Sequence, residues 1–204
     1  MSQDRRSFIK KAGLAGAALA GAAKSVAQEA PTPYEILKRQ TRPAPDRTLN
    51  VAVIGAGGMG TVDANTALMH EGVRIVAACD LYDGRLEAAK ERWGQDIFLT
   101  KDYKDILKRK EVDVVIIGTP DHWHKAISID AMKAGKHVYC EKPMVHSVGE
   151  GHELIKAWKD AGTVFMVGSQ GLSSLGNEKA KELLEAGVIG DINYAEGFWA
   201  RHSP

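Results

Sequence analysis

The sequence predicts an α/β protein with a doubly wound parallel sheet. Six short apolar segments alternate with segments whose apolar residues recur every three to four positions, which is the spacing of an amphipathic helix. A glycine-rich loop directly follows the first apolar segment. Segments that are apolar on both faces are typical of parallel strands covered by helices on both sides, joined by right-handed crossovers. The predicted strands cover residues 49–54, 73–79, 97–99, 112–117, 136–140 and 164–167.

The predicted helices end where glycine appears. The clearest helical segments are 86–93, 127–134 and 152–158, and each is followed by a glycine within a few residues. Glycine commonly ends helices, so these positions support the alternation of strand and helix. The pattern changes after residue 168. We predict a loop over 169–176, a helix over 177–186, and one further apolar strand over 192–199, whose edge would remain unpaired.

Residues 1–27 form a separate segment with its own composition. The pair Arg5 and Arg6 precedes a Gly/Ala-rich apolar run over 12–23, and small residues follow at 25–27. The run is too short to span a bilayer but suits the central part of a signal peptide. The paired arginines predict a twin-arginine signal and therefore export to the periplasm. An ordinary Sec signal or a short amphipathic anchor is the alternative.

The remaining composition is that of an ordinary globular protein. Residues 28–48 contain four prolines and are predicted to be a linker with one helical turn near 34–39. The chain carries 27 basic and 26 acidic residues, so no strong field favours nucleic acid. No apolar stretch is long enough for a stable membrane anchor. Cys79 and Cys140 fall at the ends of non-neighbouring strands, and we expect both to be packed thiols and not a disulfide.

The glycine-rich loop matches the dinucleotide-binding fingerprint G-x-G-x-x-G. It follows the first strand and opens a helix, and a glycine-rich structural turn is the alternative. Gly55 would allow the tight turn, Gly57 the approach of a pyrophosphate, and Gly60 the packing of helix against strand. The expected cofactor-binding residues of this loop are Gly55, Gly57, Gly58, Met59 and Gly60.

Asp80 ends the second predicted strand, twenty residues beyond Gly60. A carboxylate at this position accepts hydrogen bonds from the adenosine ribose and repels a 2′-phosphate. NAD is therefore the expected cofactor and NADP the less favoured one, although Arg85 lies nearby and could serve a phosphate. Asp80 could also cap the following helix, which is compatible with the same role.

Two further polar motifs follow the fourth and fifth predicted strands. Residues 119–124 read T-P-D-H-W-H, and residues 141–143 read E-K-P. The histidine pair suggests a metal site, but no Cys/His spacing fits a known zinc pattern, so we expect no metal. Lys142 would lie at the sheet edge where ligands bind, and partial burial there favours a proton-transferring lysine. A surface lysine in a proline turn is the simpler alternative.

In combination, these motifs resemble the glucose–fructose oxidoreductase/inositol dehydrogenase family (Gfo/Idh/MocA). The resemblance covers residues 49–199. It implies a Rossmann domain, here 49–168, followed by a substrate and oligomerisation domain of which 169–204 would be the truncated, α+β start. It also implies that Lys142 is the catalytic acid/base. The remaining cofactor-site residues implied by the resemblance are Thr119, Pro120, His124, Glu141 and Gln170.

The resemblance predicts an NAD(P)-dependent oxidoreductase that acts on a sugar or polyol hydroxyl and forms a homo-oligomer in a full-length form. The family's second catalytic signature, D-x-x-x-H, has no counterpart in these 204 residues. Two alternatives therefore stay open. One is an NAD-dependent redox glycosidase, against which the intact E-K-P argues, and the other is a non-catalytic NAD-binding fragment or subunit.

Overall fold

The computed structural model describes residues 46–198 and residue 200, all of which belong to one compact unit. The predicted signal segment 1–27 and nearly all of the predicted linker 28–48 lie outside the described residues. In the part of the chain that is described, no helix has both the length and the apolar character needed to cross a membrane.

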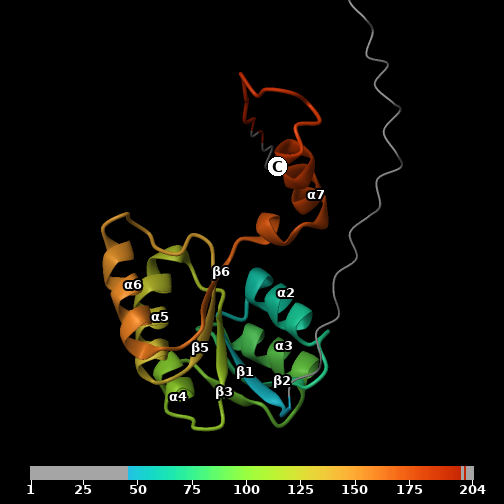
Figure 1. Ribbon diagram of the computed structural model, residues 1–204. Coiled ribbons are helices and arrows are strands. Elements are labelled where there is room, and N and C mark those ends of the chain that lie inside the picture. Colours follow the sequence, from blue (N-terminus) through green and yellow to red (C-terminus); the bar gives the residue numbers. More distant parts are fainter. Residues whose placement is uncertain (1–45, 199, 201–204) are drawn as a thin grey trace, which may run out of the picture. The chain divides into compact units, whose positions relative to one another are not determined.

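Six parallel strands form one sheet in the order β3-β2-β1-β4-β5-β6 (Figure 1). The order reverses between β1 and β4, and the carboxyl ends of these two strands border the crevice in which ligands bind in such sheets. The register pairs Ile54 at the end of β1 with Cys79 of β2 and with Ile117 of β4. The strands are β1 (Leu49–Ile54), β2 (Val73–Cys79), β3 (Phe98–Thr100), β4 (Val114–Ile117), β5 (His137–Glu141) and β6 (Phe165–Gly168).

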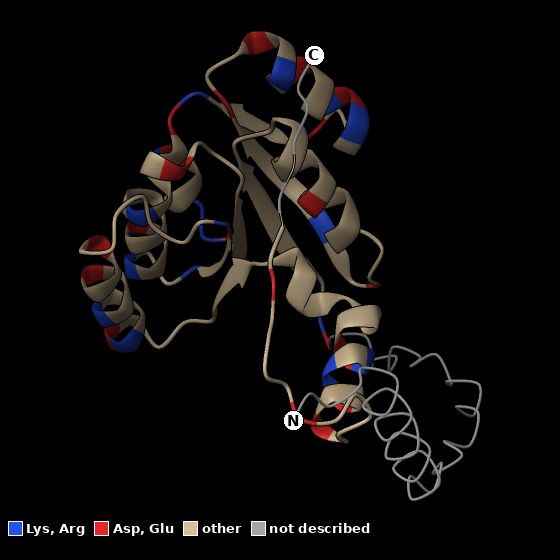
Figure 2. Ribbon diagram, turned by 90° about the horizontal axis from the view of Figure 1, so that it is seen from above, with Lys and Arg blue, Asp and Glu red and all other residues tan. Residues whose placement is uncertain are grey.

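Helices cover both faces of the sheet. Figure 1 shows α2 and α3 on one face and α4, α5 and α6 on the other. Charged side chains lie mainly on the helices and loops, and the sheet between them is almost free of charge (Figure 2). These helices are α2 (Gly58–Ala67), α3 (Asp83–Trp93), α4 (Tyr103–Leu107), α5 (His124–Lys133) and α6 (Glu150–Ala161), and α7 (Leu175–Glu185) follows β6.

The core has two unequal halves because the helix side chains in the core clusters are larger on one face than on the other. The larger cluster packs Ile117 and Cys140 of the sheet against Ile127 and Met132 of α5 and Leu154 of α6. On the opposite face the core clusters contain alanines from the helices, Ala64 of α2 and Ala89 of α3, and Leu86 of α3 is buried as well. Small residues let α2 approach the sheet closely, which places the start of this helix directly at the carboxyl ends of β1 and β4.

A buried lysine holds the turn before β4. Lys136 is 6% exposed, and its ammonium donates hydrogen bonds to the carbonyl oxygens of Arg109 and Val112, at 2.7 and 2.9 Å. Burial lowers the pKa of this lysine, and Asp113 and Glu111 partly oppose the effect. Lys136 was predicted to begin the fifth strand, but the strand begins at His137, because the backbone N–H of Lys136 donates to the carbonyl oxygen of Ala131 in α5 and not to a neighbouring strand.

The strand predicted over 192–199 is wrong. The structure shows no strand over residues 192–198, although Ile192, Tyr194 and Phe198 supply the apolar character on which the prediction rested. A strand is stable only when its backbone groups pair with a neighbour, and within the described part of the chain all six strands belong to the parallel sheet. The helix predicted over 177–186 is present as α7, and it begins two residues earlier, at Leu175.

The two cysteines are free and buried, as expected. Burial raises the pKa of the Cys79 thiol to about 12 and that of Cys140 to about 11. We therefore expect neither to react with a thiol-specific disulfide reagent at pH 8 in the folded protein, whereas both react in denaturant. A colorimetric count of released thiolate, with and without denaturant, measures this. Rapid reaction of either thiol without denaturant would contradict the packing described here.

Candidate functional site

Four loops meet at the carboxyl edge of the sheet and bring the predicted site residues together. They follow β1, β4, β5 and β6, which are neighbours in the parallel sheet. The loop after β1 carries the fingerprint glycines, and the loop after β4 carries Thr119 and Pro120. The turn after β5 carries Lys142, and the segment after β6 carries Gln170.

The fingerprint loop packs tightly where its glycines require it. Gly55 has a φ of 89°, and a Cβ added there would lie 2.7 Å from the backbone of Gly118 and Thr119. A Cβ on Gly60 would overlap the carbonyl oxygen of Gly55. A Cβ on Gly58, in contrast, would meet nothing within 4 Å. The loop is therefore closed toward the protein and open on its outer side, the side on which a ligand can approach.

The amino end of α2 has unsatisfied hydrogen-bond donors. Its N-cap residue, Gly57, supplies no side-chain cap, and its first turn contains no acidic residue. The free backbone N–H groups and the helix dipole together favour an anion. The loop geometry and this helix end form the arrangement that binds a pyrophosphate.

Asp80 occupies the position expected for contact with a ribose. It is 6% exposed, and its Oδ1 accepts a hydrogen bond from the backbone N–H of Tyr82 at 3.1 Å. Its Oδ2 lies 3.4 Å from Nη1 of Arg85, whose guanidinium also lies 4.9 Å from the ring centre of Tyr82. A Cβ added to Gly57 would come within 3.4 Å of the same guanidinium, so Arg85 bridges the second strand end and the fingerprint loop.

His124 is buried and joins two of the loops. It is 1% exposed, its Nε2 lies 2.8 Å from the carbonyl oxygen of Thr119, and its Nδ1 lies 2.7 Å from that of Pro143. The loop after β4 and the turn after β5 are thus held by one imidazole. The Thr119 hydroxyl is buried and has no hydrogen-bond partner among the described residues.

Glu141 is the buried member of the E-K-P turn, and Lys142 is the exposed one. Glu141 is 4% exposed and accepts a hydrogen bond from Nε2 of Gln170 at 3.1 Å. Lys142 forms no ion pair within the described part of the chain, and its peptide bond to Pro143 is cis. The expected partial burial of Lys142 is therefore wrong for the described fold, because the turn after β5 leaves this side chain exposed and no other side chain engages its ammonium.

Sequence reasoning missed two residues of this site, Asp63 and Tyr139. Asp63 lies one turn into α2, and its Oδ2 is buried without a hydrogen-bond partner in the described structure. Burial raises the pKa of Asp63 to about 6, and the negative charge of Glu141 adds to this shift. Tyr139 precedes Glu141 on β5 by two residues and is hydrogen-bonded to it. The sequence held one signal for Asp63: it is an acidic residue on the same helical face as Gly60 and Ala64, the face that packs on the sheet.

The expectation of no metal was drawn from spacing, and the histidines take other roles in the structure. His146 Nδ1 lies 3.2 Å from Asp121 Oδ2, and the backbone N–H of Val164 donates to His137 Nδ1. Within the described residues, no three His, Cys, Asp or Glu side chains are grouped closely enough to hold a metal ion.

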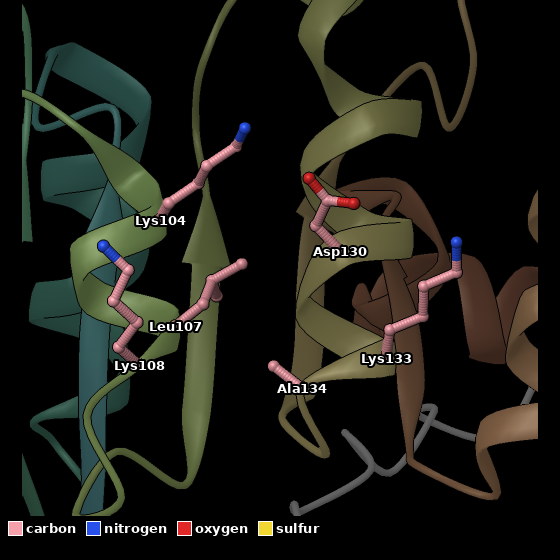
Figure 3. A pocket seen from close by; sticks show the side chains of 6 residues that line it. All are labelled: Lys104, Leu107, Lys108, Asp130, Lys133 and Ala134. Carbon is pink, nitrogen blue, oxygen red and sulfur yellow. The ribbon is translucent and has the colours of Figure 1, made fainter.

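A shallow pocket lies between α4 and α5 and contains none of the predicted site residues (Figure 3). Lys104 projects from α4 and Lys108 from the position directly after it, and Asp130 and Lys133 project from α5. Lys108 pairs with Asp105 at 2.8 Å, and the Tyr103 hydroxyl donates to Asp130 at 2.7 Å.

The residues at the carboxyl edge fit a nicotinamide dinucleotide. The open side of the fingerprint loop and the uncapped start of α2 suit the pyrophosphate, and Asp80 suits a ribose. The unpartnered Thr119 hydroxyl supplies a buried hydrogen-bonding group at the opposite side of the strand-order reversal. This arrangement defines an NAD-binding Rossmann domain.

Comparison with known proteins identifies the family. Residues 49–169 match the family model for the Gfo/Idh/MocA oxidoreductases, described as an oxidoreductase family with an NAD-binding Rossmann fold. The chain belongs to this family, and the resemblance drawn from the sequence motifs is confirmed.

Two curated relatives illustrate the range of the family. The chain is 31% identical over 161 residues to the 2,7-anhydro-N-acetylneuraminate hydratase of Mediterraneibacter gnavus, covering 78% of this chain and 42% of the relative. It is 30% identical over 148 residues to the inositol 2-dehydrogenase of Salmonella typhimurium, covering 70% and 43%. The chain thus spans less than half the length of these relatives.

Solved structures show the same fold. The myo-inositol 2-dehydrogenase of Lactobacillus plantarum matches with a TM-score of 0.67 and 32% identity, covering 72% of this chain and 43% of that one. The WlbA dehydrogenase of Chromobacterium violaceum, solved with NADH and UDP-GlcNAcA, matches with a TM-score of 0.65 and 28% identity, covering 72% and 43%.

Proposed function

We propose that this chain provides the cofactor-binding half of an NAD-dependent oxidoreductase that acts on a hydroxyl of a sugar or polyol. The observation that carries the proposal is the gathering of three motifs at the carboxyl edge of the sheet. There, the open fingerprint loop, the buried Asp80 and the E-K-P turn lie on the ends of β1, β2 and β5. The substrate class is supported by the relatives, among which are dehydrogenases of inositol.

In this proposal Lys142 transfers the proton of the substrate hydroxyl. A bound nicotinamide supplies the hydride acceptor or donor. Lys142 is available for the proton transfer because its side chain reaches solvent at this edge and is not held by another side chain of the described residues. The contacts of His124 with Thr119 and Pro143 fix the turn that carries Lys142, so the base is presented from a rigid support.

Asp80 orients the adenosine half and discriminates against a 2′-phosphate in the same proposal. Its carboxylate is fixed by the backbone of Tyr82 and is not displaced by Arg85, which contacts only one of its oxygens at 3.4 Å. We also propose that the segment 1–27, with its paired arginines, directs export by the twin-arginine route.

The test of the proposed function is calorimetric titration of the chain with NAD and with NADP. We expect saturable binding of NAD and weaker binding of NADP. Replacing Asp80 with alanine should weaken NAD binding about tenfold or more, because a buried acceptor of the ribose hydroxyls is lost. The same variant should narrow the difference between NAD and NADP, since the repulsion of the 2′-phosphate is removed.

Asp96 provides a matched control, because it is exposed and lies in the turn between α3 and β3. Asp96→Ala removes the same charge and should leave both affinities unchanged. A chain that binds neither dinucleotide, although folded by circular dichroism, would contradict the proposed function. Net release of a free sugar from a glycoside without accumulation of NADH would favour the redox glycosidase instead.

A further inference from the structure

The carboxyl edge of the sheet contains a second carboxylate beside Glu141, and the proposed function does not use it. Asp63 reaches this edge from α2, on the opposite side of the sheet plane from the E-K-P turn's helix, α6. The side chain has one oxygen that is fully buried and unpartnered among the described residues. A buried carboxylate oxygen without a hydrogen bond lowers the stability of the fold, so a residue that retains one is a candidate for a functional role.

The surroundings of Asp63 bring it toward the E-K-P turn. Tyr139 packs against the core cluster that contains Ala64, the residue after Asp63, and it is hydrogen-bonded to Glu141. The space is limited, because a Cβ added to Gly168 at the end of β6 would lie 2.7 Å from the Tyr139 hydroxyl and would overlap Glu141 Oε1. Gln170 closes the remaining side by donating to Glu141. Asp63 and Glu141 therefore form a pair of carboxylates whose charges act on each other and on the phenol of Tyr139.

No cation of the described protein neutralises this pair. Neither carboxylate takes part in an ion pair with a lysine, arginine or histidine of the described residues. Lys142 follows Glu141 in the sequence, but its side chain is exposed and unpaired. The negative charge of the pair is thus available to a cation that arrives with a ligand.

We propose that Asp63 makes the site selective for the oxidised form of the cofactor, through the charge that it adds beside Glu141 where β4 and β5 end. The inference rests on the proposed function, since it requires that a nicotinamide dinucleotide binds. The oxidised nicotinamide ring is a cation and the reduced ring is neutral, so a negative charge in a poorly solvated site favours the oxidised ring. Asp63 is a specificity-determining residue in this sense, and it transfers no proton to the substrate.

The proposal predicts a pH dependence with a definite sign. The pKa of Asp63 is raised to about 6, chiefly by burial and then by Glu141, the charged group that acts on it. Above this pH Asp63 is ionised and favours NAD, and below it Asp63 is neutral and the preference falls. Tyr139, the other titratable neighbour, has its pKa raised to about 12 by burial, Asp63 and Glu141, and stays neutral throughout this range.

The experiment measures the dissociation constants of NAD and of NADH for the unchanged chain and for Asp63→Asn, at pH 5 and at pH 8. At pH 8 we expect Asp63→Asn to shift the ratio of the two constants toward NADH by about tenfold, which corresponds to about 1.4 kcal/mol. The unchanged chain should shift in the same direction when the pH is lowered from 8 to 5, and the variant should shift much less. Asp96→Asn, which removes an exposed charge, should behave like the unchanged chain.

Each outcome decides one question. If both chains bind the dinucleotides with the same ratio at pH 8, the inference is wrong while the proposed function stands. If the unchanged chain binds neither form, the proposed function itself fails. If Asp63→Asn does not fold, the pH shift of the unchanged chain and the variant Asp63→Ser replace it, and a ratio that does not change with pH overturns the inference.

Discussion

Replacing Gly60 with alanine is expected to lower the free energy of unfolding by about 3 kcal/mol and to abolish binding of NAD. A methyl group at this position overlaps the carbonyl oxygen of Gly55, the first glycine of the loop, and approaches the side chain of Val53 in β1. Backbone atoms cannot turn aside as a flexible side chain can, so α2 must move away from the sheet. Denaturant unfolding followed by circular dichroism, together with calorimetric titration, measures both effects.

Gly84 is the matched control for this substitution. It lies in the first turn of α3, and an added methyl group would meet nothing within 4 Å. Gly84→Ala should therefore stabilise the fold by about 0.5 kcal/mol, because the alanine loses less conformational freedom than glycine on folding. Equal stability and equal NAD affinity of Gly60→Ala and the unchanged chain would show that the contact between α2 and the fingerprint loop is looser than described.

Replacing Lys142 with methionine is expected to lower the rate of substrate oxidation by about 10²- to 10⁴-fold, while the affinity for NAD changes little. The expected loss is large because no other exposed lysine follows β5 at this edge, and the described neighbours Glu141 and Gln170 are engaged with each other. Methionine keeps the length and apolar character of the side chain and removes only the proton-transferring group. The measurement is the initial rate of NADH formation with a panel of polyols and sugars that includes myo-inositol.

Lys159→Met provides a comparison at an exposed lysine of α6 and should leave the rate unchanged. Retention of the full rate by Lys142→Met would remove Lys142 from the proton transfer. Absence of oxidation of every panel member by the unchanged chain, in spite of NAD binding, would support a non-catalytic NAD-binding role for this chain.

The pattern of apolar segments predicted the sheet well because burial on both faces leaves a local signal. All six strands are present, and β1 and β2 have the predicted bounds. The fourth strand begins at Val114 instead of Val112, because the backbone of Val112 belongs to the turn held by Lys136. The short helix α4 was not predicted, since five residues are too few to establish a helical period.

The candidate site was predictable where its chemistry lies in contiguous motifs. The fingerprint glycines and Asp80 follow strand ends, and the topology brings them to one edge. Asp63 and Tyr139 were missed because their proximity depends on how closely α2 approaches β5. A local sequence pattern does not indicate the spacing between two elements that are distant along the chain. The last predicted strand failed for a related reason: apolar character alone does not supply the partner that a strand requires.

The contacts of His124 have a consequence for redesign of this protein. Because one imidazole spans the carbonyl oxygens of Thr119 and Pro143, the two loops behave mechanically as a single piece. If one loop is exchanged and the other is kept, the imidazole of His124 loses one of its two carbonyl partners. Transplantation of this pocket onto another scaffold therefore has to carry 119–124 and 141–143 together.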